Sequence, residues 1–490
     1  MAELPFDNSY ARELEGLWLK ASPARAPEPE LIRFNRPLAD ELGIDVSGLT
    51  DENLAARFSG NDLPEGAAPL AMAYAGHQFG HFSPQLGDGR AILIGEVIDW
   101  NGKRRDIQLK GSGRTPFSRG GDGYSALGPV LREYMVSEFM HACGVPSTRA
   151  LAAVKTGNTV YRETEKPGAV MTRVAASHIR IGTFQFFAAR GDIASVKRLL
   201  DHAIARHHPH ASEAANPALA FFESVCAAQA RLIALWTGLG FVHGVMNTDN
   251  MSVSGETIDF GPCAFMDHYD PHALFSSIDR NGRYAFSNQP MIAQWNLSRL
   301  AETLVPLVEG DQDKAVAALT AVLEAFPSVF ERERLAVMRR KLGLAAESDG
   351  DAALIKRLLD RMQLETVDHT VAFRALADSA MDGDSTGFED LFADKILISA
   401  WLFDWRKRQN SERGTLENCA RLIQAANPAF IPRNHRIEEA IRAAEDHNDF
   451  APFHRLAEVL SNPLEDQPDH KDLQLPPRPE QRVTKTFCGT

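Results

Sequence analysis

The sequence predicts an α+β protein in which a β-rich part precedes an α-rich part. Two patterns carry this prediction: short β-like runs around glycine begin at Leu86, and helical patterning dominates from Ala188 onward. At roughly 150 residues per domain, a chain of 490 residues allows about three structural units. We expect these segments in order: an N-terminal extension (1–65), a β-rich N-lobe (66–187), a mainly helical C-lobe (188–344), a C-terminal helical region (345–462) and a flexible tail (463–490).

The β-rich part is expected to begin with a hairpin. Residues 91–99 and 104–111 are short β-like runs on either side of Asn101-Gly102, a dipeptide that favours tight hairpin turns. A helix is expected next, over 128–144, because Pro129 suits the first helical turn and a glycine stands at the end.

Further elements follow the same reasoning. Two more strand-like runs occupy 147–157 and 158–175. A strand–turn–strand unit is expected at 250–261, with a Ser-Gly pair at its bend. The polar stretch 345–351 separates the two helical segments, and 396–408 has a helical pattern within the second.

Composition and charge exclude several classes of protein. The hydrophobic fraction is 44% and the charged fraction 24%, values near the globular average that argue against a disordered or fibrous chain. Lys and Arg number 52 against 65 Asp and Glu, so the formal charge of -13 opposes extended binding to nucleic acid or to an anionic membrane. We therefore expect neither nucleic acid nor a membrane as a partner.

The cysteines indicate a reducing compartment. They are scattered, and no two form a CxxC pair. The first residues also lack a positively charged and apolar leader, so we expect a location in the bacterial cytoplasm. The five positions are Cys143, Cys226, Cys263, Cys419 and Cys488.

The first candidate for chemistry is a glycine turn, Gly87-Asp88-Gly89-Arg90, just before the predicted hairpin. Adjacent glycines allow backbone N–H groups to approach phosphate oxygens closely. Glycine turns of this kind also occur in hairpins that bind nothing, so the motif alone leaves both interpretations open.

The second candidate is Lys110, at the end of the second strand of the hairpin. A lysine in this position can hold a phosphate if a carboxylate orients it, and Glu133 on the following predicted helix is the expected partner. Glu138 on the same helix is the rival. The alternative is that Lys110 only caps a surface strand.

A third group combines a carboxylate, an amide and several arginines. Asn250 and Asp259 stand at opposite ends of the strand–turn–strand unit, from which they can converge on a divalent cation that bridges phosphate oxygens. In an acidic chain, arginines near such a pocket can clamp phosphate with two parallel hydrogen bonds. The arginines concerned are Arg114, Arg119, Arg173 and Arg180.

These pieces, in this order, resemble a protein-kinase fold with one departure. When His243 and Asn250 are aligned on the kinase catalytic loop, Val245 stands where the catalytic aspartate belongs. Valine cannot accept a proton. Asp249 is the nearest substitute carboxylate.

The stretches AYAGHQFGHFSPQLGDGRA, KGSGRTPFSRGGDG, HGVMNTDNM and IDFGPCAFMD closely resemble the selenoprotein O family, a set of pseudokinases that act as protein adenylyltransferases. The resemblance implies a two-lobed kinase-like fold that transfers AMP from inverted ATP to Ser, Thr or Tyr hydroxyls of proteins. It also implies Mg²⁺ or Mn²⁺ as the metal. The implied ATP contacts are Gly87, Gly89, Arg90, Lys110, Asp122, Gly123, Arg173, Arg180 and Asp259; the metal ligands are Asn250 and Asp259, and the proton acceptor is Asp249.

The resemblance further implies redox control at the C-terminus. The family often carries a selenocysteine there, and Cys488 holds the corresponding place. A thiol on a flexible tail can form a reversible disulfide, with Cys263 as the most consequential partner. An inert, buried Cys263 fits the sequence equally well.

Two other functions remain open from the sequence. One is conventional phosphoryl transfer of the γ-phosphate, with Asp249 as the base. The other is an inactive ATP-binding scaffold that senses redox state through its tail. The sequence names neither the protein substrates nor the oligomeric state, and it leaves transfer of UMP possible.

Overall fold

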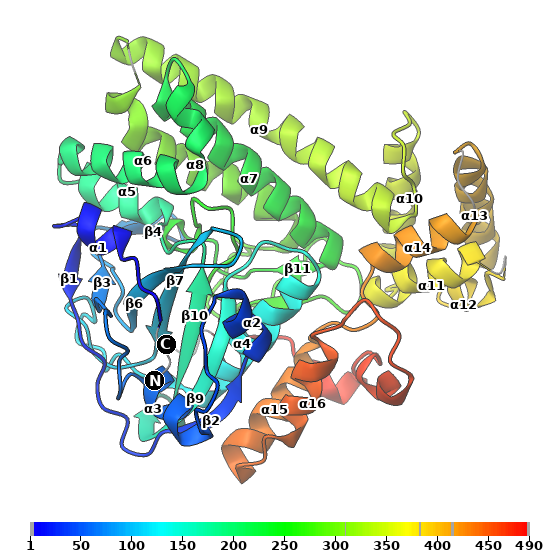
Figure 1. Ribbon diagram of the computed structural model, residues 1–490. Helices are drawn as coiled ribbons and strands as arrows, with labels where there is room; N and C mark the ends of the chain where they lie inside the picture. The colour runs from blue at the N-terminus through cyan, green and yellow to red at the C-terminus, as the bar shows by residue number, and fades with distance from the viewer. Residues whose placement is uncertain (1–3, 309, 382–383, 413–415, 488–490) are drawn as a thin grey trace.

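The computed structural model describes residues 4–308, 310–381, 384–412 and 416–487. The predicted α+β class is confirmed, because antiparallel sheets occupy the first part of the chain and helices dominate the rest. Figure 1 shows three parts: a sheet region (4–180), a central helical region (181–344) above it, and a C-terminal helical region (345–462) at its side.

The sheet region is built on one antiparallel sheet of eight strands. Its order is β1-β3-β6-β7-β10-β9-β2, and β8 pairs with β10. Both ends of this order come from the segment expected as an N-terminal extension, so that segment completes the sheet. The strands are β1 (Trp18–Lys20), β2 (Glu30–Phe34), β3 (Leu70–Met72), β6 (Ala91–Ile98), β7 (Arg104–Lys110), β8 (Ser125–Ala126), β9 (Arg149–Tyr161) and β10 (Glu165–Ala175).

The predicted hairpin is present as β6 and β7. Gly102 adopts a φ of +72° at its turn, a left-handed conformation that glycine reaches without strain. The register pairs Ala91 with Lys110, so the lysine stands at the end of its strand. The predicted helix is α4 (Leu127–Ala142), which packs across β9 and β10 with its apolar residues buried.

Smaller elements complete the sheet region. Helix α3 packs on β2, β9 and β10, and a capping box between Thr50 and Asn53 satisfies its first N–H groups. A separate two-stranded hairpin, β4 and β5, lies off the main sheet. The bounds are α1 (Ser9–Glu13), α2 (Arg36–Glu41), α3 (Asp51–Ser59), β4 (Gly76–Gln78) and β5 (His81–Ser83).

The central helical region is organised around α7 (Pro217–Leu239), which packs against α8 and α9. Within the described residues, α7 is the one helix long and apolar enough to cross a membrane by length and composition, and 56% of its apolar window is buried in the protein. Burial of this kind is typical of a core helix. The other elements are α5 (Ile181–Ala188), α6 (Ile193–His207), α8 (Gln289–Leu304), α9 (Gln312–Lys341), β11 (Phe241–Val242) and β12 (Ala264–Phe265).

The strand–turn–strand unit expected at 250–261 is not a paired hairpin, and that prediction was wrong. Gly255 does form the bend, with a φ of +79°. The two arms pair elsewhere: Ser252 bridges Arg180, and Thr257 bridges Ser147. Neighbouring segments supply the backbone partners, so the arms do not need each other.

The C-terminal helical region has a hydrophobic core of its own, which includes Trp401 and Trp405. Helices α15 and α16 instead join the main core and pack on α4 (Figure 1). Two ion pairs fasten α15 to the sheet region, Arg132–Glu438 and Lys166–Glu445. The helices are α10 (Asp351–Leu364), α11 (His369–Met381), α12 (Thr386–Glu389), α13 (Lys395–Asn410), α14 (Leu416–Ala426), α15 (Asn434–His447) and α16 (Ala451–Val459).

The described part of the tail, 463–487, makes specific contacts although it was expected to be flexible. Thr486 is buried, and its backbone pairs with the segment Phe275–Ser277. Its hydroxyl donates to the Pro262 carbonyl oxygen at 2.5 Å. Thr486 thus lies against the segment that follows Asp259.

Candidate active site

A cavity of about 390 Å³ lies between the sheet region and the central helical region. Strands β7 and β10, helix α4, the hairpin β4–β5 and two loops of the helical region all contribute side chains to its lining. The charged lining residues are Asp88, Arg90, Lys110, Arg119, Glu133, Arg173, Arg180, Asp249 and Asp259. Most of the predicted site residues therefore meet in one place.

Lys110 is held between two carboxylates. Its Nζ lies 2.6 Å from Glu133 Oε2 and 2.6 Å from Asp259 Oδ1. The rival Glu138 turns away and binds Arg149, with its Oε2 at 2.8 Å from the guanidinium. Glu133 is therefore the helix carboxylate that contacts the strand lysine.

Arg173 and Arg180 are the two buried arginines of the cavity, and each is 1% exposed. Arg173 Nη1 donates to Asp259 Oδ1 at 2.7 Å. Arg180 stacks over the ring of Tyr74, at 4.4 Å from its centroid, and donates to the His178 carbonyl oxygen. Together with Lys110 they make three buried cations in the lining of the cavity, each paired with a carboxylate of that lining.

Asp259 forms ion pairs with both Lys110 and Arg173. Burial alone would raise its pKa, but the charges of Lys110, Arg173 and Arg180 outweigh burial and hold the pKa well below its ordinary value. Its backbone adopts a φ of +65°, which is rare for a residue other than glycine and typical of functional sites. The carboxylate therefore stays ionised, as a metal ligand must.

Asp249 is a second buried carboxylate, but its pKa is shifted in the opposite direction to that of Asp259. Burial raises its pKa to about 6. Gln78 Nε2 donates to its Oδ2 at 3.3 Å, while Oδ1 has no hydrogen-bond partner among the described residues. Asp249 can therefore accept a proton near neutral pH.

The loop that carries Asp249 is fixed from several sides. His243 Nε2 lies 2.9 Å from the carbonyl oxygen of Ile258, which joins this loop to the residue before Asp259. Asn250 Nδ2 donates to the Val245 carbonyl oxygen at 3.0 Å. Val245 lines the same cavity.

Asn250 and Asp259 both line the cavity and offer hard oxygen atoms. Asn250 uses its Nδ2 for the Val245 carbonyl oxygen, so its Oδ1 is the atom of the amide that can accept or bind a cation. No group of three or more His, Cys, Asp or Glu side chains that could hold a metal is found in the described part of the chain. These two residues fit Mg²⁺ as it occurs with nucleotides, held by one or two protein ligands, water and phosphate oxygens.

The glycine turn packs against the loop that follows β7. Gly87 has a φ of +71°, and a Cβ there would meet the Phe117 ring at 2.2 Å. Gly89 and Arg90 line the cavity, whereas Gly87 lies behind it. Glycine is thus required at position 87 by close packing, in addition to any role toward phosphate.

Asp122 and Gly123 are not among the residues that line the cavity. Arg162 binds the Asp122 carboxylate at 2.8 Å and lowers its pKa. Gly123 approaches Gly113 so closely that a Cβ would meet its carbonyl oxygen at 2.1 Å. In this structure both residues shape the loop beside the cavity.

The hairpin β4–β5, which was not predicted from the sequence, holds the loop that carries Asp249. The backbone N–H of His77 donates to Thr248 Oγ1 at 2.7 Å, and that of Phe79 donates to Asn247 Oδ1 at 3.1 Å. A Cβ at Gly76 would meet Asp249 Oδ1 at 2.5 Å. The glycines of GHQFGHFS were the available signal, since glycine permits such close approach.

The two cysteines expected to act in redox control are placed differently. Cys263 is fully buried, its Sγ donates to the Phe260 carbonyl oxygen at 3.1 Å, and burial raises its pKa to about 12. Cys488 lies outside the described residues. A thiol in the environment of Cys263 is protonated and unreactive.

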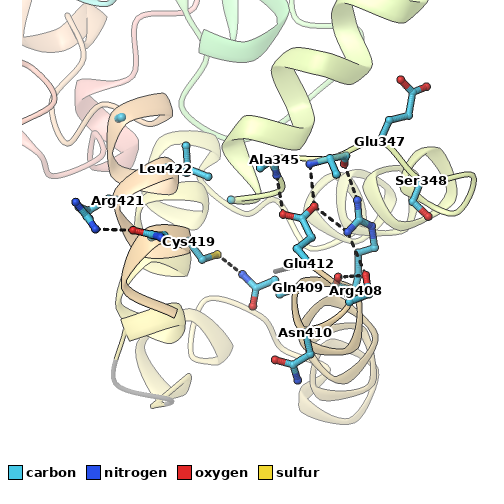
Figure 2. A pocket seen from close by; sticks show the side chains of 15 residues that line it. Ala345, Glu347, Ser348, Arg408, Gln409, Asn410, Glu412, Cys419, Arg421 and Leu422 are labelled. Atoms are coloured by element: carbon cyan, nitrogen blue, oxygen red, sulfur yellow. Dashed lines mark hydrogen bonds and ion pairs between the residues drawn. The ribbon is translucent and has the colours of Figure 1, made fainter. Parts of the chain in front are cut away.

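A larger cavity of about 1020 Å³ lies in the C-terminal helical region (Figure 2). Its charged side chains are already satisfied by their neighbours: Arg408 binds Glu412 at 2.9 Å, and Glu412 accepts from the backbone of Ala345 and Ala346. Glu412 also directly precedes residues 413–415, which the structure does not describe. Volume alone therefore gives this cavity no role.

Comparison with known proteins identifies the family. The family model described as "Protein adenylyltransferase SelO" matches residues 1–461. The chain is 57% identical over 490 residues to the "Protein nucleotidyltransferase YdiU" of Rhizobium johnstonii (strain DSM 114642 / LMG 32736 / 3841), and the match covers 100% of this chain and 98% of that protein.

Other relatives of the same name agree. The protein of Rhizobium meliloti (strain 1021) is 56% identical over 491 residues, which cover 100% of both chains. That of Bradyrhizobium sp. (strain ORS 278) is 55% identical over 486 residues, which cover 99% of both chains. The resemblance seen in the sequence is confirmed: the chain belongs to the SelO family and is, by that membership, a nucleotidyltransferase.

Proposed function

We propose that this protein transfers AMP from ATP to Ser, Thr or Tyr hydroxyl groups of proteins in the bacterial cytoplasm. The observation that carries the proposal is the convergence of Lys110, Arg173 and Arg180 on one cavity with Asp249 and Asp259. The description of the matching family, a protein adenylyltransferase, agrees with it, and the relatives named above are bacterial.

We also propose that the chain has a two-lobed, protein-kinase-like (pseudokinase) fold. The contact between Lys110 on β7 and Glu133 on α4 supports this, because kinases fix their ATP-binding lysine in the same way. The loop with His243 and Asn250, followed by Asp259, supports it as well. Val245 removes the kinase base from its usual place.

The distribution of charge supports an inverted nucleotide. Among the residues that line the cavity, Lys110, Arg173 and Arg180 are buried, whereas Arg119 and Ile278 are exposed. Distal phosphates attract the buried cations most strongly, since they carry the most negative charge and the low dielectric strengthens the attraction. The α-phosphate then remains available to an acceptor.

The chemical step needs one proton acceptor. The acceptor oxygen attacks the α-phosphorus, the bond between the α-phosphorus and the bridging oxygen to the β-phosphate breaks, and pyrophosphate leaves with the bond's electrons. The hydroxyl proton passes to the carboxylate of Asp249. A pKa of about 6 leaves this group ionised at pH 7 and still basic enough to accept.

Asn250 and Asp259 would hold the Mg²⁺ or Mn²⁺ ion through their oxygen atoms. When bound, the ion would neutralise phosphate charge as it develops during transfer. Glu133 orients Lys110 toward the phosphates through their ion pair. Arg173 binds Asp259, as Lys110 does. These side chains bind and orient the nucleotide; only Asp249 moves a proton.

We propose redox control between Cys488 and Cys263 as a secondary function of the tail. Its support is the position of Thr486, which binds the Pro262 carbonyl oxygen one residue before Cys263. Because Cys263 is buried and its pKa is raised, disulfide formation requires this segment to open first.

The test uses purified protein, magnesium, a bacterial protein mixture and ATP labelled at either the α- or the γ-phosphate. We expect α-label on protein and none from the γ-position, with the α-label lost in Asp259→Ala. Label from the γ-position alone would make the protein a kinase, and none from either would favour an ATP-binding scaffold. UTP labelled at the α-phosphate, tested alongside, decides between AMP and UMP.

A further inference from the structure

Two buried side chains connect the arginines of the cavity to each other. Gln108 lies on β7 directly opposite Arg173 on β10, in the antiparallel register of the two strands. Gln108 Oε1 accepts from Arg173 Nη2 at 2.6 Å and from its Nε at 3.2 Å. The guanidinium is thereby fixed along one edge, and its Nη1 remains directed at Asp259.

The other end of the same amide reaches the glycine turn. Gln108 Nε2 donates to Asp88 Oδ2 at 3.3 Å. The orientation of the amide is determined by its partners, because only an oxygen can accept from Arg173 and only an NH₂ group can donate to Asp88. Gln108 is 0% exposed, so both bonds are shielded from bulk solvent.

Asp88 completes the connection. Its Oδ1 lies 3.5 Å from Arg180 Nη1, and its Oδ2 also accepts from the backbone N–H of Met72 at 3.1 Å. Asp88 is 1% exposed and belongs to the turn that carries Gly89 and Arg90 into the cavity. One carboxylate therefore ties the glycine turn to Arg180 and, through Gln108, to Arg173.

We propose that Gln108 and Asp88 form a bridge that holds Arg173, Arg180 and the glycine turn in a single arrangement matched to the distal phosphates of the nucleotide. The inference rests on the proposed function, in which the two arginines take those phosphates. Gln108 does not line the cavity and acts only through its neighbours, so it is a positioning residue. Asp88 lines the cavity as well as bridging.

The physical reason is the cost of misplacing a buried charge. An arginine held by fixed acceptors meets its phosphate without reorganising, whereas a free one must first adopt the right orientation. Loss of the bridge should therefore weaken binding of the triphosphate and spare binding of the nucleoside. A role in folding alone would not distinguish these two ligands.

The test is Gln108→Met, which keeps the length of the side chain and removes both hydrogen bonds. We expect the dissociation constant of ATP to rise about 10- to 100-fold, as for other residues that orient ligand-binding groups, while that of AMP changes less than about twofold. The KM for ATP in α-label transfer should rise with it, and kcat should change less.

Two comparisons make the result specific. Arg173→Ala should show the same preference against ATP, and the double variant Gln108→Met/Arg173→Ala should be no worse than Arg173→Ala alone. Asn427→Ala is the matched control. Asn427 is another buried amide, lies in the C-terminal helical region and accepts a hydrogen bond from Lys341. This variant should lower the melting temperature and leave both dissociation constants unchanged.

The outcomes separate the bridge from the proposed function. If Arg173→Ala loses ATP affinity and Gln108→Met does not, the proposed bridge is wrong. Binding of the distal phosphates by Arg173 would still be supported. If ATP affinity is unchanged in Arg173→Ala, Arg173 does not bind the phosphates, and the proposed bridge is wrong as well. If Gln108→Met does not fold, Gln108→Glu asks the same question, because its carboxylate still accepts from Arg173 but repels Asp88.

Discussion

Two buried lysines show how differently this chain treats positive charge. Lys110 in the cavity has two carboxylates, each with an oxygen 2.6 Å from its Nζ. Lys341, at the end of α9, is 2% exposed, and no carboxylate lies within 4 Å of its Nζ among the described residues. Its Nζ instead donates to Asn427 Oδ1 at 2.6 Å and lies 4.1 Å from the centroid of the Phe373 ring.

The pKa of Lys341 shows that these partners do not replace an ion pair. Burial lowers the pKa from an ordinary value of 10.5 to about 7, despite a small opposing effect of Cys143. In the cavity, the carboxylates of Asp88, Glu133 and Asp259 compensate the buried cations until a ligand arrives. The buried ammonium of Lys341 lies outside the cavity. We therefore expect it to lower the stability of the fold and to have no effect on nucleotide transfer.

The largest effect is expected at the carboxylate shared by the cavity cations. Asp259→Asn keeps the shape of the side chain and removes its charge. Because a metal supplies several kcal/mol of stabilisation, α-label transfer should fall about 1,000-fold or more. Transfer within tenfold of the wild type, with a native circular dichroism spectrum, would exclude Asp259 as a metal ligand.

The next effect tests the proton acceptor. Asp249→Asn should lower kcat about 100-fold or more and leave the dissociation constant of ATP nearly unchanged, since a general base acts on the step and not on nucleotide binding. In the wild type, kcat should fall as the pH drops below about 6, where the carboxylate becomes protonated. An unchanged rate in the variant, or a flat profile from pH 5 to 7, would assign the proton to another group.

A smaller effect separates two glutamates of one helix. Glu133→Gln should raise the KM for ATP about 10- to 100-fold, because Lys110 loses the partner that orients it. Glu138→Gln is the matched control, since Glu138 binds Arg149 and should affect the melting temperature but not KM. Equal KM values in the two variants would contradict the role given to the Lys110–Glu133 pair.

The smallest effect is one of stability and concerns Lys341. Between pH 7 and 10.5 the folded protein has lost a proton that the unfolded chain still holds, so the stability contributed by this group rises with pH. Lys341→Met should therefore raise the melting temperature at pH 6.5, by about 2–4 °C per kcal/mol gained, with a smaller advantage at pH 9.

The control for Lys341→Met is Lys314→Met, which changes an exposed lysine of α9. It should leave the melting temperature unchanged at both pH values. A lower melting temperature for Lys341→Met at pH 6.5 would show that Asn427 and Phe373 compensate the buried charge. ATP affinity should stay at the wild-type value in both variants.

Local patterns in the sequence predicted one side of the cavity well. Asn101-Gly102 fixed the hairpin, and the hairpin fixed the position of Lys110 at the end of its strand. The sequence predicted Glu133 as the partner of Lys110 but left Glu138 as a rival, because the choice depends on the rotation of α4 about its axis. Residues five positions apart point about 140° apart on a helix, so only one of the two can face Lys110.

Contacts between distant segments could not be predicted. Gln78 and Asp249 are separated by 171 residues, and neither carries a pattern that points to the other. The bond between Gln108 and Asp88 depends on which strands pair, and β3, β6, β7 and β10 are neighbours only in the folded sheet. The strand pair expected at 250–261 failed for the same reason, since its backbone partners come from elsewhere.

The most direct test is a crystal structure of the protein with magnesium and an ATP analogue that has a methylene group between the α- and β-phosphates. The proposed function predicts that the β- and γ-phosphates contact Arg173 and Arg180, that the metal lies at Asn250 and Asp259, and that the α-phosphate faces Asp249. A γ-phosphate directed at Asp249, with the adenosine at the buried end, would contradict adenylyl transfer and indicate a kinase.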